Sequence, residues 1–147
     1  MTDSEVTTSP TELAESLRAT NLSGVMPDPS SIPVIKVQSF LIDDQLTEVF
    51  LQVFADRLLI GISQLPDGRI GHYCICEPIP SAINPKSVDY PVTSLLGTST
   101  VESAVYARRL AERLKRTVVL GISMKQTKNA EIFHAIVDLV VTMYQSA

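Results

Sequence analysis

The sequence is poor in the residues that build catalytic and metal sites. Its 147 residues include no tryptophan, two cysteines and two histidines. A catalytic constellation or a four-ligand metal site usually draws on more such groups than these. Cysteines at positions 74 and 76 alone also cannot form the framework of a disulfide-stabilised secreted domain. We therefore expect a cytoplasmic protein of a reducing compartment, without a cofactor and without enzymatic activity.

Long apolar runs are absent too. The longest apolar stretches are shorter than a bilayer-spanning helix, and Gly61 or Asp138 lies within or beside them. The first residues, MTDSEVTTSP, have neither a basic start nor an apolar core. We therefore expect no signal peptide and no contact with a membrane.

A positive charge excess is also lacking, because the formal net charge is −4. An acidic balance disfavours binding to nucleic-acid phosphates, and the sequence has no aromatic RNA-binding motif and no paired-cysteine finger. We expect no nucleic-acid partner. Apolar residues make up 45% of the chain and charged residues 19%, which is typical of a globular domain.

The chain divides into a tail and one domain. Residues 1–32 are rich in Ser, Thr and Pro, which predicts a flexible tail. Ser9-Pro10-Thr11-Glu12 matches a capping box, so a short helix there is the alternative. Residues 33–147 are predicted to form a single domain.

The order of the periodic patterns predicts an α+β fold, a mainly antiparallel sheet of about six strands with two C-terminal helices packed on one face. Short turns at 43–45 and 65–68 favour an antiparallel meander of the first four strands, and the proline-rich residues 77–92 predict a loop. The predicted strands are 34–42, 46–54, 57–64, 69–77, 92–96 and 117–124, and the predicted helices are about 99–116 and 128–145.

Two strands with related sequences, LLIGIS and VVLGIS, carry the main evidence for a partner. Their large aliphatic residues alternate, so they share one face of the sheet. The opposite face is small and uncharged, whereas a solvated sheet face is usually polar. Two helices cover only one face, so we expect a partner chain on the other. The residues predicted to bind it are Leu59, Gly61, Ser63, Val119, Gly121 and Ser123.

Each predicted helix has two interpretations. The last helix is apolar over most of its circumference, so it is either central in its own core or part of an interface. The helix before it carries Arg108, Arg109, Arg113, Lys115 and Arg116. This cluster is either an ordinary solvated face that complements the helix dipole or a contact for an acidic partner or a nucleic-acid backbone.

Two patterns that suggest chemistry have simpler explanations. His72, Cys74 and Cys76 share one strand face, but their spacing suits a tetrahedral metal site poorly, and buried inert thiols are the usual case. Gly97-Thr98-Ser99-Thr100 lacks the second glycine and the lysine of a phosphate-binding loop. Ser99 and Glu102 instead predict a capping box at the start of the helix.

The stretch PVTSLLGTSTVESAVYARRLAERLKRTVVLGISM resembles the small proteasome assembly chaperones. The likeness runs from about Val34 to Tyr144 and rests on SLLG before the helix, ARRLAERL within it and VVLGIS after it. The type called proteasome assembly chaperone 4 is the nearest in resemblance, and its sister type, chaperone 3, is a close second.

The resemblance implies a heterodimer with a sister chaperone that binds α-type proteasome subunits, notably α5. The pair would promote formation of the α ring of the 20S core particle, in the cytoplasm and the nucleus, without a cofactor. Leu95, Leu96, Gly97 and Thr98 are added to the candidate partner-binding residues.

Two alternative functions are a longin- or roadblock-like scaffold for a small GTPase, and a small thiol or metal enzyme that uses Cys74 and Cys76.

Overall fold

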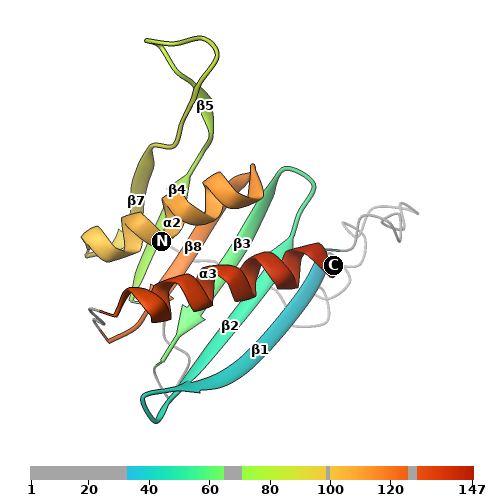
Figure 1. Cartoon of the computed structure of the whole chain (residues 1–147), viewed down its shortest axis with the longest axis vertical. Coiled ribbons are helices and arrows are strands. Elements are labelled where there is room, and N and C mark those ends of the chain that lie inside the picture. Colours follow the sequence, from blue (N-terminus) through green and yellow to red (C-terminus); the bar gives the residue numbers. More distant parts are fainter. Residues whose placement is uncertain (1–32, 65–70, 99, 126–128) are drawn as a thin grey trace, which may run out of the picture. The chain divides into compact units, whose positions relative to one another are not determined.

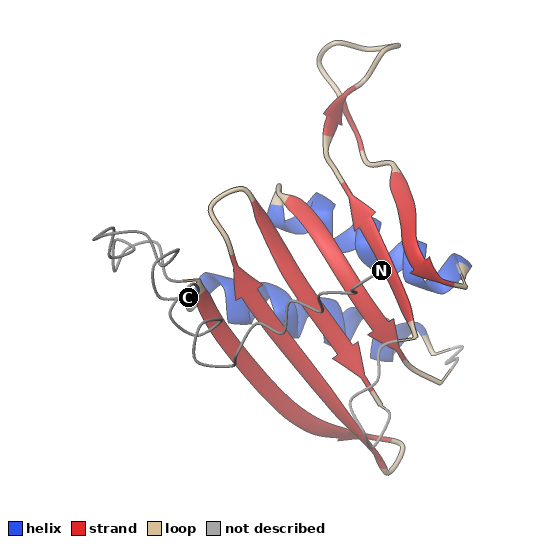
Figure 2. Cartoon of the chain, turned by 180° about the vertical axis from the view of Figure 1, so that it is seen from behind, coloured by secondary structure: helices blue, strands red, loops and turns tan. Residues whose placement is uncertain are grey.

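The computed structural model describes residues 33–64, 71–98, 100–125 and 129–147. Within these ranges, a six-stranded sheet forms one layer and two helices form a second layer on one of its faces (Figures 1 and 2), which confirms the α+β class. The helices are α2 (Val101–Leu114) and α3 (Ala130–Gln145). The strands of the sheet are β1 (Val34–Ile42), β2 (Gln45–Val53), β3 (Arg57–Ser63), β4 (His72–Cys76), β7 (Val92–Gly97) and β8 (Thr117–Ser123).

The strand order is β1-β2-β3-β8-β4-β7, so the predicted four-strand meander is wrong. Strand β8 lies between β3 and β4, parallel to β3 and antiparallel to β4. Every residue of β8 is buried or half-buried, as expected for a strand at the centre of a sheet. The turn signal at 65–68 lies outside the described residues.

The hairpin between β1 and β2 agrees with the sequence prediction. Ile42 pairs with Gln45, and the two residues between them, Asp43 and Asp44, have φ values of 48° and 61°. Two consecutive residues with positive φ form a type I′ turn, whose twist matches the right-handed twist of the two strands that it joins. Aspartate tolerates this backbone conformation better than most residues. The turn therefore sets the register of the long β1–β2 pair.

Both helices pack on the same face of the sheet. The core between the layers includes Leu58, Ile60, Val118 and Leu120, each fully buried. Five residues of α3 are buried against this core, so its wide apolar surface is largely used within the chain. The buried residues of α2 are Ser103, Tyr106, Ala107, Leu110, Ala111 and Leu114.

The start of α2 differs from the prediction by one residue. Its N-cap is Thr100, whose side chain accepts a hydrogen bond from the Ser103 amide at 3.1 Å, and the Thr100 amide donates to the Ser103 hydroxyl at 3.4 Å. The capping box is thus Thr100 with Ser103 rather than the predicted Ser99 with Glu102, and Ser99 itself lies outside the described residues. The hydroxyl of Ser103 replaces the carboxylate that usually closes this motif, which is why the sequence pattern was misleading.

The predicted loop at 77–92 contains regular structure. Strands β5 (Ile79–Pro80) and β6 (Val88–Asp89) pair as a second, two-stranded sheet that projects beyond the main one (Figure 1). Ser81 and Asn84 accept hydrogen bonds from nearby amides at its tip. Local side-chain bonds therefore order this arm in spite of its prolines.

Gly97 ends β7 in a conformation that other residues avoid. Its φ is +83°, and a Cβ atom placed on it would lie 2.2 Å from the carbonyl oxygen of Gly71. Because that neighbour is backbone, it cannot move aside as a flexible side chain would. The glycine is thus required by the close approach of β7 to the start of β4.

We predict that Gly97→Ala lowers the free energy of unfolding by at least about 2 kcal/mol, from left-handed strain and the backbone clash together. Gly71→Ala is the matched control, because its Cβ would meet nothing closer than the Ile122 oxygen at 3.6 Å. Urea denaturation of both variants measures the difference. Equal losses at the two positions would contradict this account of Gly97.

Candidate protein-protein interface

The face of the sheet opposite the helices, which is turned toward the viewer in Figure 2, has exposed apolar residues on several strands. Directly paired residues of neighbouring strands share a face, so the strand register identifies its members. We call this surface the open face. Its apolar residues are Ile35, Val37, Leu41, Leu46, Phe50, Leu59, Tyr73, Ile75, Leu96 and Val119.

Several of these side chains are strongly exposed. Val37 is 63% exposed, Leu41 68% and Leu96 67%, and Ile35 and Leu46 also exceed half. Six strands about 4.8 Å apart and about seven residues long, at about 3.4 Å per residue, present roughly 700 Å². That approaches the surface of about 800 Å² that each partner buries in a standard protein complex. The open face thus has the size and the composition of an interface.

The structure brings six of the predicted partner-binding residues together. Leu59 pairs with Val119, Gly61 with Gly121, and Ser63 with Ser123, at the centre of the open face. They are buried or half-buried rather than fully exposed. Of the other four, Leu95, Leu96 and Gly97 end β7 at one edge of the sheet and Thr98 follows it, and Leu96 pairs with Tyr73 on the open face.

Gly61 has a role within the chain as well. A Cβ atom placed on Gly61 would fall within the ring of Phe50, which lies directly opposite on β2. The Phe50 ring therefore occupies the space that a side chain at position 61 would need. Gly61, one of the small residues that suggested a partner, thus makes room for Phe50 within the chain.

Sequence reasoning missed the part of this exposed surface that lies on β1 and β2. Ile35, Val37 and Leu41 extend the open face to the β1 edge. A signal was present, because VIKVQSFLI has apolar residues at both alternating sets of positions. Such a strand is expected to need cover on both faces.

On the helix side, His72, Cys74 and Cys76 share the buried face of β4, as predicted. Both cysteines are fully buried, and the Cys74 thiol lies 4.0 Å from the Ser103 carbonyl oxygen in α2. Burial, helped by the neighbouring Cys76, raises the pKa of the Cys74 thiol to about 11. Burial also raises the pKa of Cys76. Thiols that are buried and protonated are poor nucleophiles and poor metal ligands.

A cavity of about 270 Å³ adjoins the start of α2 and is lined by Thr98, Thr100 and Ser103 among others. A phosphate site would need free amides or cations here. Among the residues that the structure describes, the cavity lining contains neither lysine nor arginine, and Glu102 contributes a negative charge. Thr100 and Ser103 already bind each other's amides, so the residues present do not fit a phosphate group.

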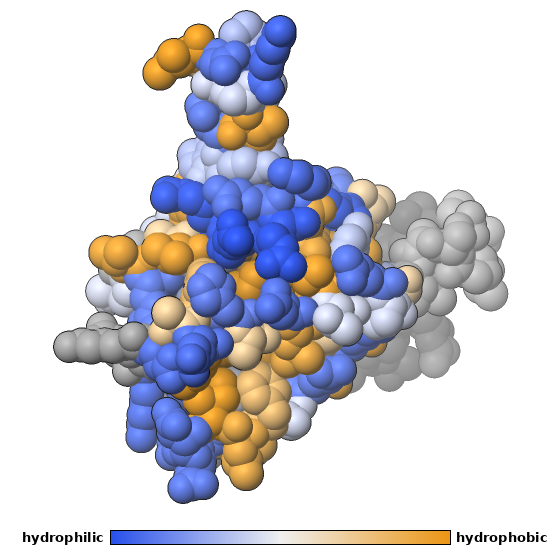
Figure 3. Space-filling model, in the orientation of Figure 1, coloured by the Kyte–Doolittle hydropathy of each residue, from blue (hydrophilic) through white to orange (hydrophobic). Residues whose placement is uncertain are grey.

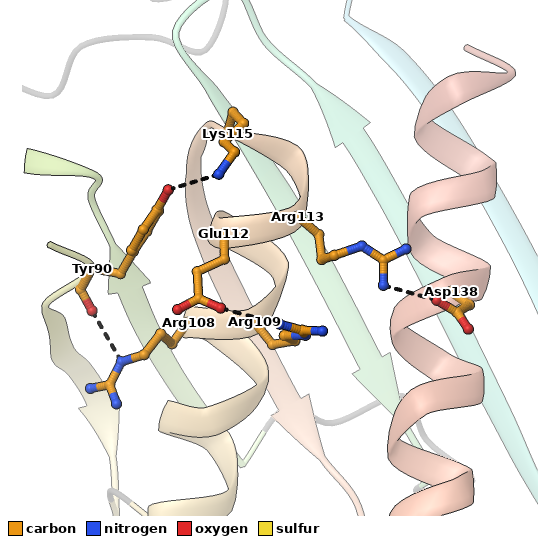
Figure 4. A network of polar contacts seen from close by, with 7 residues as sticks. All are labelled: Tyr90, Arg108, Arg109, Glu112, Arg113, Lys115 and Asp138. Atoms are coloured by element: carbon orange, nitrogen blue, oxygen red, sulfur yellow. Dashed lines mark hydrogen bonds and ion pairs between the residues drawn. The ribbon is translucent and has the colours of Figure 1, made fainter. Parts of the chain in front are cut away.

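The basic cluster at the end of α2 divides into structural and surface members. Arg116 donates to the carbonyl oxygens of Phe54 and Ala55 at 2.8 and 2.6 Å, so it holds the β2–β3 connection. The others lie on the outer surface of α2 (Figure 4), where Arg108 donates to the Tyr90 carbonyl at 3.2 Å and Arg113 bridges to Asp138 of α3 at 3.1 Å.

Within the described ranges, neither helix is long and apolar enough to cross a membrane. The same ranges hold no group of three His, Cys, Asp or Glu side chains placed to bind a metal ion. What the described surface does offer is a broad apolar sheet face and a basic helix face.

Comparisons with known proteins give two findings. A family model described as proteasome assembly chaperone 3 matches residues 68–143. A chain of the solved structure described as "Crystal Structure of a Novel Chaperone Complex for Yeast 20S Proteasome Assembly" has a similar fold, with a TM-score of 0.61, 14% identity, and coverage of 76% of this chain and 98% of that chain. At this identity, the likeness shows the fold. No curated protein sequence matches.

We predict that neither thiol reacts readily in the folded protein. At pH 8, a pKa of about 11 leaves roughly one Cys74 thiol in a thousand ionised, and both side chains are fully buried. Titration with a coloured disulfide reagent should label no cysteine within minutes in buffer and both cysteines in guanidinium chloride. Rapid labelling of the folded chain would instead favour a thiol-based activity.

Proposed function

The chain belongs to the proteasome assembly chaperone 3 family, and on that premise we propose that it acts by binding proteasome subunits during assembly. The single observation that carries this is the family match over residues 68–143. It corresponds to the type that the resemblance placed second, and it gives no support to the chaperone 4 type. The family role is that of a non-catalytic chaperone, which agrees with the expectation that the chain is not an enzyme.

We propose that the open face pairs with a sister chaperone to form a heterodimer. The support is physical. Exposed aliphatic residues on two adjoining strands are unfavourable in water, and burial gains about 25 cal/mol for each Å² of apolar surface removed from it. The helices occupy the other face, so a second sheet can stack on this one without rearrangement.

The heterodimer is proposed to bind α-type proteasome subunits, notably α5, and to promote α-ring formation of the 20S core particle. The heterodimer would favour one arrangement of neighbouring α-type subunits. It would dissociate when a later subunit covers the site on the α-type subunit that the heterodimer occupies. No cofactor or turnover is required. We place this activity in the cytoplasm and the nucleus.

We predict that Val37→Glu abolishes the 1:1 complex with a co-expressed sister chaperone. A carboxylate at this position would be buried by the stacked sheet without a partner charge. Val101→Glu is the matched control, because Val101 is 84% exposed at the first turn of α2, where a carboxylate is favoured by the helix dipole. Light scattering of the co-purified proteins measures the mass of each complex.

Loss of the complex in both variants, or in neither, would contradict pairing through the open face. Circular dichroism checks that Val37→Glu is folded, which is expected because Val37 already faces solvent in the single chain.

Affinity purification of the wild-type chain adds a test of function. Recovery of a small GTPase without proteasome subunits would favour the scaffold alternative.

A further inference from the structure

A groove on the helix side of the molecule has no role in pairing through the open face. It has a volume of about 210 Å³ and lies between α2 and α3. Val105, which is 44% exposed, and Phe133 form an apolar floor. The Tyr106 ring packs edge-to-face against the Phe133 ring, with 4.6 Å between the ring centroids, and this contact holds the Phe133 ring in position. Arg108, Arg109 and Glu112 form the charged rim.

The charge around this groove is unlike that of the rest of the domain. Residues 33–147 contain eleven basic and eleven acidic residues, and five of the basic ones lie between 108 and 116. Figure 3 shows the most hydrophilic part of this face over α2, with apolar residues between the polar ones. The groove is therefore a positive, partly apolar surface on a domain without net charge.

The rim cations are available to a partner. Arg108 uses its Nε to bind the Tyr90 carbonyl, and its terminal nitrogens have no hydrogen-bond partner among the described residues (Figure 4). Arg109 approaches Glu112 only at 3.5 Å, with both side chains more than a third exposed. Exposed pairs of this kind contribute between about 0 and 1 kcal/mol, so an incoming carboxylate can replace Glu112.

The supporting contacts hold the rim in place before binding. Lys115, the C-cap of α2, donates to the Tyr90 hydroxyl at 3.4 Å, so this residue and Arg108 of α2 together fix the base of the projecting arm. Arg113 bridges to Asp138 at 3.1 Å and ties α2 to α3 beside the groove. A surface ordered in this way loses little conformational freedom when a ligand binds.

We infer that this groove, which we call the arginine groove, binds an acidic segment of the α-type subunit, with one apolar side chain of that segment on Val105 and Phe133. The inference rests on the proposed function and assigns its two surfaces, because the open face takes the sister chaperone and the arginine groove takes the subunit. Guanidinium groups bind carboxylates with two parallel hydrogen bonds, which gives specificity for an acidic segment. The apolar floor favours a protein segment over a nucleic-acid backbone.

The test uses the full chain, co-purified with its sister chaperone, and measures binding to purified α-type subunits by calorimetry. Arg108→Glu is expected to weaken binding at least about tenfold, as for an interface arginine that contributes strongly. Val105→Ser should weaken it about threefold by removing apolar contact. Glu112→Gln should strengthen binding about two- to fivefold, because it frees Arg109.

Lys125→Glu is the control, because Lys125 is exposed, lies outside the groove and undergoes the same charge change as Arg108→Glu. The inference is supported if Arg108→Glu and Glu112→Gln shift affinity in opposite directions while Lys125→Glu leaves it unchanged. A misfolded variant cannot produce the gain expected from Glu112→Gln.

Three results would overturn the inference. One is that Arg108→Glu and Glu112→Gln both bind α-type subunits with wild-type affinity, a result that would leave the proposed function intact. Another is equal weakening by Lys125→Glu and Arg108→Glu, which would indicate a general charge effect. The last is a single-stranded 20-mer oligonucleotide that binds the wild-type chain and loses affinity in Arg108→Glu. Absence of any wild-type binding to α-type subunits, by contrast, would remove the proposed function together with the inference.

Discussion

The arrangement of this domain depends on one constraint, which is that both helices lie on the same face of a sheet that is apolar on both faces. Strand β8 pairs with β3 and β4 at the centre of the sheet, and α2 and α3 precede and follow it. The packed face buries Leu58, Ile60 and Leu120 completely. The chain supplies no third layer within its described residues, so Val37 and Leu41 lie in solvent. The hydrophobic effect that builds the core thus also favours association with a second chain.

The same constraint separates the two surfaces in space. A partner sheet on the open face leaves α2 and α3 on the outside of the pair, where the arginine groove can meet a third protein. The two surfaces also differ in chemistry, because one is broad and aliphatic and the other is narrow, basic and centred on Phe133 and Arg108. Such a difference suits a permanent partner on one side and a transient one on the other, since obligate interfaces are the more hydrophobic.

The fold was largely predictable from the sequence, and its topology was not. Periodicity and turn residues located each strand of the main sheet and both helices from Val34 onward, and Asp43 and Asp44 marked the first hairpin, whereas the short strands β5 and β6 were missed. The position of β8 was not predictable in this way, since strand pairing is decided by packing over long sequence separation. The capping-box pattern also placed the N-cap of α2 one residue too early, because the side chain that bonds back to the N-cap amide is that of Ser103 and not that of Glu102. On the open face, the sequence pattern identified the paired small residues of β3 and β8. The packing of Phe50 on Gly61 and the exposed residues of β1 were recognised only once the pairing of the strands was known.

The most direct test of the central claim is an isotope-filtered nuclear Overhauser experiment on the heterodimer, with methyl groups labelled in this chain and the sister chaperone unlabelled. The account predicts intermolecular contacts from the methyl groups of Ile35, Val37 and Leu41 on the open face, and none from Val101 and Val105 on α2. Contacts confined to the α2 methyl groups, with none from the open face, would contradict it.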